Sequence, residues 1–133
     1  MSLSLMEMVA TARAKVREVA PVEAGAALEH GEIKLVVDVR ERDEFEDAHL
    51  PGAVNVPRGL LEIRADPASP ATDPVLSSDP TARILVYCTK APSARSVLAA
   101  QTLTSMGYEH VETLEGGLNA WAEASLPVEG EPR

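Results

Sequence analysis

Cys88 is the only cysteine of the chain, and the residues around it are suited to nucleophilic chemistry. The thiol follows the apolar run 84–87, which predicts a buried strand. It precedes a loop over residues 89–94 and a helix that begins near Arg95. Open α/β folds bind their ligands at the carboxyl ends of strands, and a helix start there favours a thiolate. We therefore expect Cys88 to be accessible and reactive.

A lone cysteine is also often a small buried hydrophobic residue without chemistry. The composition of the loop weighs against that alternative, because hydrogen-bond donors and basic side chains crowd the thiol. Besides Arg95, which we expect to act with Cys88, the residues expected to bind an anion are Thr89, Lys90, Ala91, Ser93, Ala94 and Ser96.

The 133-residue chain is acidic, with 12 basic and 21 acidic residues and a net charge of −9. This balance disfavours general binding to nucleic acid or to an anionic membrane, so we expect neither as a partner. One cysteine excludes an intramolecular disulfide and a multi-cysteine metal site, and His30 and His110 lack metal-ligand spacing. We expect no metal and no cofactor.

The chain contains no apolar run near the roughly 18 residues of a membrane span and no evident signal peptide. Its free thiol fits a reducing compartment, which favours a cytoplasmic protein.

Helical and strand patterns alternate along the chain. Ser4 and Glu7 have capping-box spacing for a first helix over residues 4–14. Strands are expected over residues 16–20, 33–39, 53–56, 84–87 and 110–114. Helices are expected over residues 21–30, 41–48, 95–106 and 118–124, with one turn at 60–64. Four prolines predict a long irregular loop over residues 66–81. The alternation indicates an α/β fold with a mostly parallel central sheet, flanked by helices on both faces.

Seven short segments follow one another along the chain: Val36-Val37-Asp38-Val39-Arg40, His49-Leu50-Pro51-Gly52-Ala53-Val54-Asn55-Val56-Pro57, Val86-Tyr87-Cys88, Arg95-Ser96, Met106-Gly107-Tyr108, Leu114-Glu115-Gly116-Gly117 and Ala120-Trp121. With these segments in this order and at this spacing, the chain closely resembles the rhodanese-like sulfurtransferase domain from about residue 19 to 129. The resemblance implies a rhodanese-like domain over residues 16–130 behind an N-terminal helical extension over residues 1–15. The extension could contact a second copy in a homodimer, although packing on its own domain is favoured.

The resemblance also implies the chemistry. Cys88 would attack the outer sulfur of a small donor such as thiosulfate, release sulfite, and carry the sulfur as a persulfide. Cyanide or a thiol would then accept that sulfur. Arg95 would stabilise negative charge or pair with a carboxylate beneath the loop, and Lys90 would attract a dianionic donor.

Three further residues are candidates for support of the site. Asp38 and Arg40 end the central strand, and Asp38 would accept hydrogen bonds from the loop or belong to a structural network. Arg64 would reach the pocket and attract anions, or lie on the surface as an ordinary arginine.

The loop departs from the family pattern in its length. Six residues separate Cys88 from Arg95, against four in the common sulfurtransferase loop and five in the related phosphatase branch. Pro92 also removes one backbone donor. Two alternatives to a sulfurtransferase therefore stay open: a non-catalytic rhodanese-like binding or regulatory module, and a cysteine-dependent phosphatase or arsenate-reductase-like enzyme.

Overall fold

The computed structural model describes residues 2–130, which form the expected alternation of helices and strands. The strands are β1 (Arg17–Val19), β2 (Leu35–Asp38), β3 (Val54–Asn55), β4 (Arg83–Tyr87) and β5 (His110–Leu114). The helices are α1 (Leu5–Arg13), α2 (Pro21–Glu29), α3 (Arg42–Asp47), the 3₁₀ turn η1 (Arg58–Leu60), α4 (Leu61–Ala65), α5 (Pro74–Ser77), α6 (Ala94–Ser105) and α7 (Gly117–Glu123).

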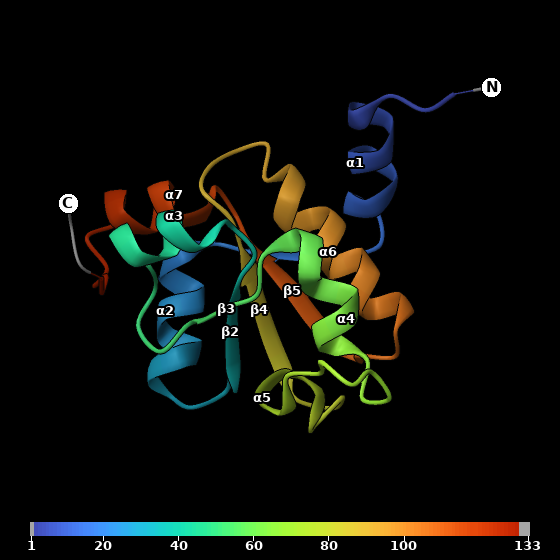
Figure 1. Ribbon diagram of the computed structural model, residues 1–133. Helices are drawn as coiled ribbons and strands as arrows, with labels where there is room; N and C mark the ends of the chain where they lie inside the picture. The colour runs from blue at the N-terminus through green and yellow to red at the C-terminus, as the bar shows by residue number, and fades with distance from the viewer. Residues whose placement is uncertain (1, 131–133) are drawn as a thin grey trace.

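The five strands form one parallel sheet in the order β1-β5-β4-β2-β3, which confirms the predicted sheet (Figure 1). The chain moves from β2 to β3 on one side of the sheet and from β4 to β5 on the other. The order therefore reverses between β2 and β4, whose last residues Asp38 and Tyr87 are register partners. In open α/β sheets a ligand site lies outside the carboxyl ends at such a switch point. Cys88 follows Tyr87 directly at this position.

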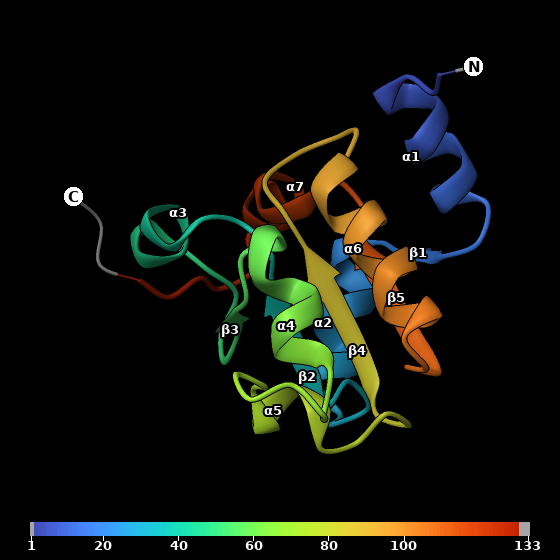
Figure 2. The ribbon, with the colours of Figure 1, turned by 45° about the vertical axis from the view of Figure 1, so that its right-hand side comes forward.

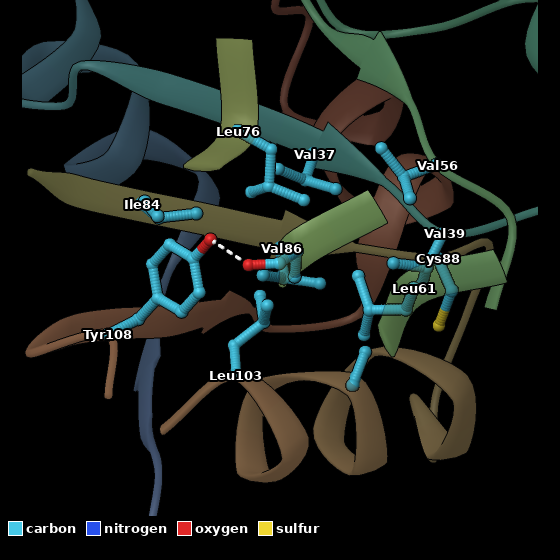
Figure 3. Close-up of a cluster of buried hydrophobic side chains, with 12 residues drawn as sticks. Val37, Val39, Val56, Leu61, Leu76, Ile84, Val86, Cys88, Leu103 and Tyr108 are labelled. Atoms are coloured by element: carbon cyan, nitrogen blue, oxygen red, sulfur yellow. Dashed lines mark hydrogen bonds between the residues drawn. The ribbon is translucent and has the colours of Figure 1, made fainter. Parts of the chain in front are cut away.

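Helices cover both faces of the sheet, as the alternation predicts (Figures 1 and 2). Buried residues of α2 and α7 pack on one face, and buried residues of α4, α5 and α6 pack on the other. Successive side chains of a strand point to opposite faces. Ile84, Val86 and Cys88 therefore share the face of α4 and α6, while Leu85 and Tyr87 point to α2 and α7. Figure 3 shows Cys88 at one end of the buried cluster on the face of α4 and α6.

The N-terminal helix α1 packs on the outer side of α6. Ser4 and Glu7 form the expected capping box, with both hydrogen bonds at 3.1 Å. The spacing of Val9 and Ala12 places both on one helical face, where they are buried in a cluster with Val97 of α6. The helix therefore packs on its own domain, the alternative that the sequence favours. A contact with a second copy in a homodimer stays a prediction.

The structure corrects two details of the expected elements. The proline-rich segment contains a short helix, α5, because Asp73 caps it through the Val75 amide and Pro74 occupies its first turn. The strand expected over residues 33–39 is shorter, since the amide of Ile33 donates to the Ala27 carbonyl and leaves the ladder. Among residues 2–130, no helix has the length and apolar character needed to span a membrane.

Candidate active site

The Cys88 side chain lies beneath the first turn of α6. Its sulfur is 3.4 Å from the Ser96 hydroxyl, which in turn lies 3.2 Å from the Ser93 carbonyl and donates to it. In Figure 3 the sulfur points away from the sheet toward this turn. Contrary to the expectation of an accessible thiol, Cys88 is only 3% exposed, because it belongs to the buried cluster that α4 and α6 form with the sheet.

The loop and the start of α6 present backbone amides around this sulfur. The amide of Val97 makes the first hydrogen bond of the helix, to the Ser93 carbonyl at 2.9 Å. The three helical amides before it, of Ala94, Arg95 and Ser96, precede the intrahelical ladder and point out of the helix end. Together with the positive end of the helix dipole, they favour an anion at this position.

Ser93 shapes the turn that leads into α6. It adopts a left-handed conformation with φ of 62°, is buried, and donates its amide to the Lys90 carbonyl at 2.9 Å. A non-glycine residue in this region costs about 1–2 kcal/mol, a strain that clusters at functional sites. The surrounding fold therefore holds the loop in a specific shape.

A cavity of about 210 Å³ opens above the thiol, lined by all eight residues from Cys88 to Arg95. This volume exceeds more than tenfold the roughly 10–15 Å³ that one water requires, so a small oxyanion can enter. Lys90 and Ala91 are exposed at its rim. The loop residues predicted from the sequence are thus gathered in one pocket, with Ser96 beneath them.

The other side of the loop is anchored by the turn before α7. The amides of Leu118 and Asn119 donate to the carbonyls of Cys88 and Thr89, each at 2.9 Å. Gly117 permits this approach, since a Cβ there would lie 2.5 Å from the Cys88 carbonyl oxygen, and its φ is +61°. The Gly116-Gly117 pair is therefore part of the support of the nucleophile.

Arg95 lines the cavity and forms a bidentate pair with Glu44 of α3. The two N–O distances are 2.8 and 3.2 Å, and Nη2 of Arg95 also contacts the Thr89 hydroxyl at 3.2 Å. The Arg95 hydrogen bond lowers the pKa of Glu44 to about 2, and Glu44 raises the pKa of Arg95 in return. This geometry matches the second expectation for Arg95, a pairing with a carboxylate, and gives it a role in holding the loop.

Asp38 and Arg40 belong to a buried network beside the site. The Asp38 carboxylate accepts from the Arg40 side chain at 2.7–3.1 Å and from the Tyr87 hydroxyl at 2.6 Å. Burial alone would lower the pKa of Arg40, but the hydrogen bond to Asp38, the charge of Asp38 and the neighbouring Tyr87 together more than offset burial and raise that pKa. This geometry matches the second expectation for Asp38, a structural network, with Arg40 and Tyr87 as its partners.

Arg64 is not part of this site. Its guanidinium donates to the Ala71 carbonyl at 2.9 Å, which ties α4 to the proline-rich segment. Arg64 is not among the residues that line the Cys88 cavity, whereas Leu61 at the start of α4 lies next to the thiol (Figure 3). The expectation that it attracts anions to the pocket is therefore wrong.

The model of the rhodanese-like domain family matches residues 20–124 of the chain. The chain belongs to the rhodanese-like domain family. Several relatives are named as sulfurtransferases. A "Sulfurtransferase" of Allochromatium vinosum is 34% identical over 71% of this chain and 77% of its own length. "Thiosulfate sulfurtransferase GlpE" of Coxiella burnetii is 28% identical over 79% of this chain and 86% of its own.

The chain is also similar to part of a longer protein and to solved structures of comparable length. "Adenylyltransferase and sulfurtransferase UBA4" of Candida albicans is 31% identical over 79% of this chain, which spans only 23% of that protein. Among solved structures, a Rhodopseudomonas palustris protein described as a possible tyrosine phosphatase has a TM-score of 0.87 at 32% identity, over 97% of this chain and 96% of its own. The human single-domain sulfurtransferase TSTD1 has a TM-score of 0.69 at 26% identity, over 81% and 96%.

Two supports of this rhodanese-like site escaped prediction. Glu44 was not singled out, although a carboxylate partner for Arg95 was expected, because its distance of 51 residues from Arg95 carries no local signal. Arg13 of α1, whose guanidinium donates to the Pro92 carbonyl, was not singled out either. Both contacts depend on how helices far apart in the chain pack together.

Proposed function

We propose that this protein moves sulfane sulfur from thiosulfate or a related anionic donor to a thiophilic acceptor, through a persulfide on Cys88. One observation carries the proposal. Cys88 lines a cavity of about 210 Å³ together with Ala94 and Arg95 of the first turn of α6, whose amides precede the intrahelical hydrogen bonds. Relatives named as sulfurtransferases support the same reaction class.

In the first half-reaction, the Cys88 thiolate attacks the outer sulfur of thiosulfate. A new S–S bond forms to Cys88, the S–S bond of thiosulfate breaks, and sulfite leaves with its electron pair. Charge is conserved, since a thiolate and a dianion become a persulfide anion and a sulfite dianion. The amides of Ala94, Arg95 and Ser96 would stabilise the negative charge that the persulfide retains.

In the second half-reaction, cyanide or a thiolate attacks the outer sulfur of the persulfide. Thiocyanate or a new persulfide leaves, and the Cys88 thiolate returns with the electron pair of the broken bond. The transferred atom lies one bond farther into the cavity than the buried Cys88 sulfur. This position explains how a nucleophile that is 3% exposed can still deliver its cargo to an acceptor.

The test is intact-protein mass spectrometry after incubation with thiosulfate. We expect a mass increase of one sulfur atom located at Cys88, an equal amount of released sulfite, and discharge by cyanide as thiocyanate. Cys88→Ser keeps the size of the side chain and should abolish all three signals. Sulfur transfer that survives in Cys88→Ser would assign the nucleophile elsewhere, and an unmodified wild-type protein would favour the non-catalytic module.

A phosphatase is the second candidate, favoured by the six-residue loop and by the likeness to the protein described as a possible tyrosine phosphatase. Phosphate-ester hydrolysis needs a general acid for its leaving group. The carboxylate that contacts the loop, Glu44, has a pKa of about 2 beside Arg95 and is ionised at neutral pH. Thiosulfate needs no such acid, because sulfite leaves without protonation. Sulfur transfer is therefore the better-supported reaction.

The two reactions are separated by assaying thiosulfate and an aryl phosphate with one preparation. We expect thiosulfate turnover to exceed phosphate turnover. Faster hydrolysis of the phosphate, lost in Cys88→Ser, would reverse the assignment.

A further inference from the structure

Arg13 connects the N-terminal helix to the middle of the Cys88 loop. Its guanidinium donates through Nη2 to the Pro92 carbonyl and pairs through Nη1 with Glu18 of β1. Arg13 lies outside residues 20–124, which match the family model, so the family match does not include this contact.

Both elements that hold this guanidinium are themselves fixed. Helix α1 is capped by Ser4 and Glu7 and packs on α6 through Val9 and Ala12, which are 1% and 0% exposed. Glu18 lies in β1, in register with Thr113 of β5. The Arg13 head group therefore has a rigid support on two sides, and its contact with Pro92 constrains the loop rather than the helix.

The loop has free space on the side where Arg13 reaches it. A cavity of about 450 Å³ lies there, lined by residues that include Arg13, Glu18, Pro92 and Glu115. Pro92 borders this open space and is itself exposed, so neighbouring side chains do not enclose it. Arg13 lines this space, and its guanidinium supplies a charge-assisted hydrogen bond at the point where the loop turns toward Ser93 and α6.

We propose that Arg13 is a positioning residue for the Cys88 loop. By holding the Pro92 carbonyl, it keeps the Ser93 turn and the amides of Ala94 to Ser96 at the distance from the sulfur that anion binding and thiolate attack require. The six-residue loop is thus completed by a helix from outside the family domain. This inference rests on the proposed function for its effect on sulfur transfer, but its effect on thiol reactivity is independent of it.

The test compares Arg13→Met with Arg13→Lys and with the neighbouring control Lys15→Met, an exposed residue that lies outside the Cys88 cavity. Three quantities are measured: the single-turnover rate of persulfide formation, the alkylation rate of Cys88 with iodoacetamide, and the midpoint of thermal unfolding. Methionine keeps an unbranched apolar stem and removes the donors. Misplaced catalytic groups commonly cost up to about 100-fold in rate.

We expect Arg13→Met to slow both reactions by about tenfold or more, at an unfolding midpoint close to that of the wild type. Arg13→Lys should recover part of the loss through one remaining donor, and Lys15→Met should behave as the wild type. A wild-type protein that is alkylated but takes no sulfur from thiosulfate would contradict the proposed function alone, because the alkylation rates still test Arg13.

Unchanged alkylation in Arg13→Met would overturn the role of Arg13. The role of Arg13 would also be overturned if Arg13→Met and Arg13→Lys lost the same amount of rate and the same amount of thermal stability, because such losses indicate a general role in folding. Glu18→Gln removes the charge that orients Arg13 and serves if Arg13→Met does not fold. An alkylation rate below that of the wild type in this variant supports the proposal, and a wild-type rate contradicts it.

Discussion

Arg95 of α6 and Glu44 of α3 face each other as a bidentate ion pair, with N–O distances of 2.8 and 3.2 Å. The Thr89 hydroxyl lies between them, at 3.2 Å from the guanidinium and 3.4 Å from the carboxylate. The pair therefore joins α3 to both ends of the loop that holds Cys88. This pairing is one of the two roles expected for Arg95, and it links the guanidinium to the shape of the pocket.

Glu44→Gln should loosen this pocket. The pKa of Glu44 is lowered to about 2 by Arg95, so its pair contributes stability above the unfolded carboxyl pKa of about 4.3 and loses it as the pH falls through 2. The pair is partly exposed, which limits the contribution to about 1 kcal/mol or less. We expect denaturant titrations to show this loss at pH 7 and a smaller difference from the wild type near pH 3.

Glu46→Gln provides the matched control, because Glu46 pairs with Arg42 on the exposed side of the same helix. It should leave the alkylation rate of Cys88 unchanged, while Glu44→Gln alters it. Equal alkylation rates in both variants would show that Glu44 has no part in the site.

Gly117→Ala should disturb Cys88 directly. The new Cβ would lie 2.5 Å from the Cys88 carbonyl oxygen and 2.7 Å from the Thr89 carbonyl carbon, at a φ of +61°. We expect the free energy of unfolding to fall by more than about 1 kcal/mol and the alkylation rate of Cys88 to fall with it. Gly31→Ala is the control, since Gly31 has a φ of +70° but nothing within 4 Å. A comparable loss of Cys88 reactivity in both variants would argue against the close approach as its cause.

Tyr87→Phe should destabilise the fold without abolishing the chemistry. The Tyr87 hydroxyl donates to Asp38 at 2.6 Å and accepts from the Leu50 amide at 3.1 Å, and its removal leaves both buried groups short of a partner. We expect a loss of about 1–3 kcal/mol in urea unfolding. Tyr108→Phe removes a single hydrogen bond, to the Ala65 carbonyl (Figure 3), and should cost less. The reverse order would mean that the Asp38 network contributes little.

Lys90→Ala should weaken the use of thiosulfate mainly through KM. Lys90 is exposed at the rim of the Cys88 cavity, where its charge attracts the dianion before the reaction. A pair of unit charges 4 Å apart in water gains about 1 kcal/mol, so KM should rise about fivefold at low salt. The rise should shrink with added salt because ions screen the attraction. Lys34→Ala is the control, because Lys34 is an exposed lysine outside that cavity. An equal KM in the two variants would show that Lys90 takes no part in substrate binding.

Local sequence patterns were sufficient for most of the architecture. The capping box at Ser4, the β-branched run before Asp38 and the glycine pair before Leu118 depend on neighbours within a few residues, and the structure confirms each of them. The alternation of strands and helices then predicted a parallel sheet, whose carboxyl edge is where Cys88 lies. The helix α5 was missed because four prolines within one segment indicated a loop, although Pro74 is compatible with a first helical turn.

The sequence by itself therefore determined the fold class, the position of the thiol and the loop that surrounds it, because each follows from local periodicity and chain order. Only the tertiary structure decided which charged groups meet. Arg95 pairs with Glu44, Asp38 turns to Arg40 and Tyr87, and Arg64 bonds to Ala71. The physical reason is that long polar side chains have several possible partners, and the packing of whole helices against the sheet selects one arrangement among them.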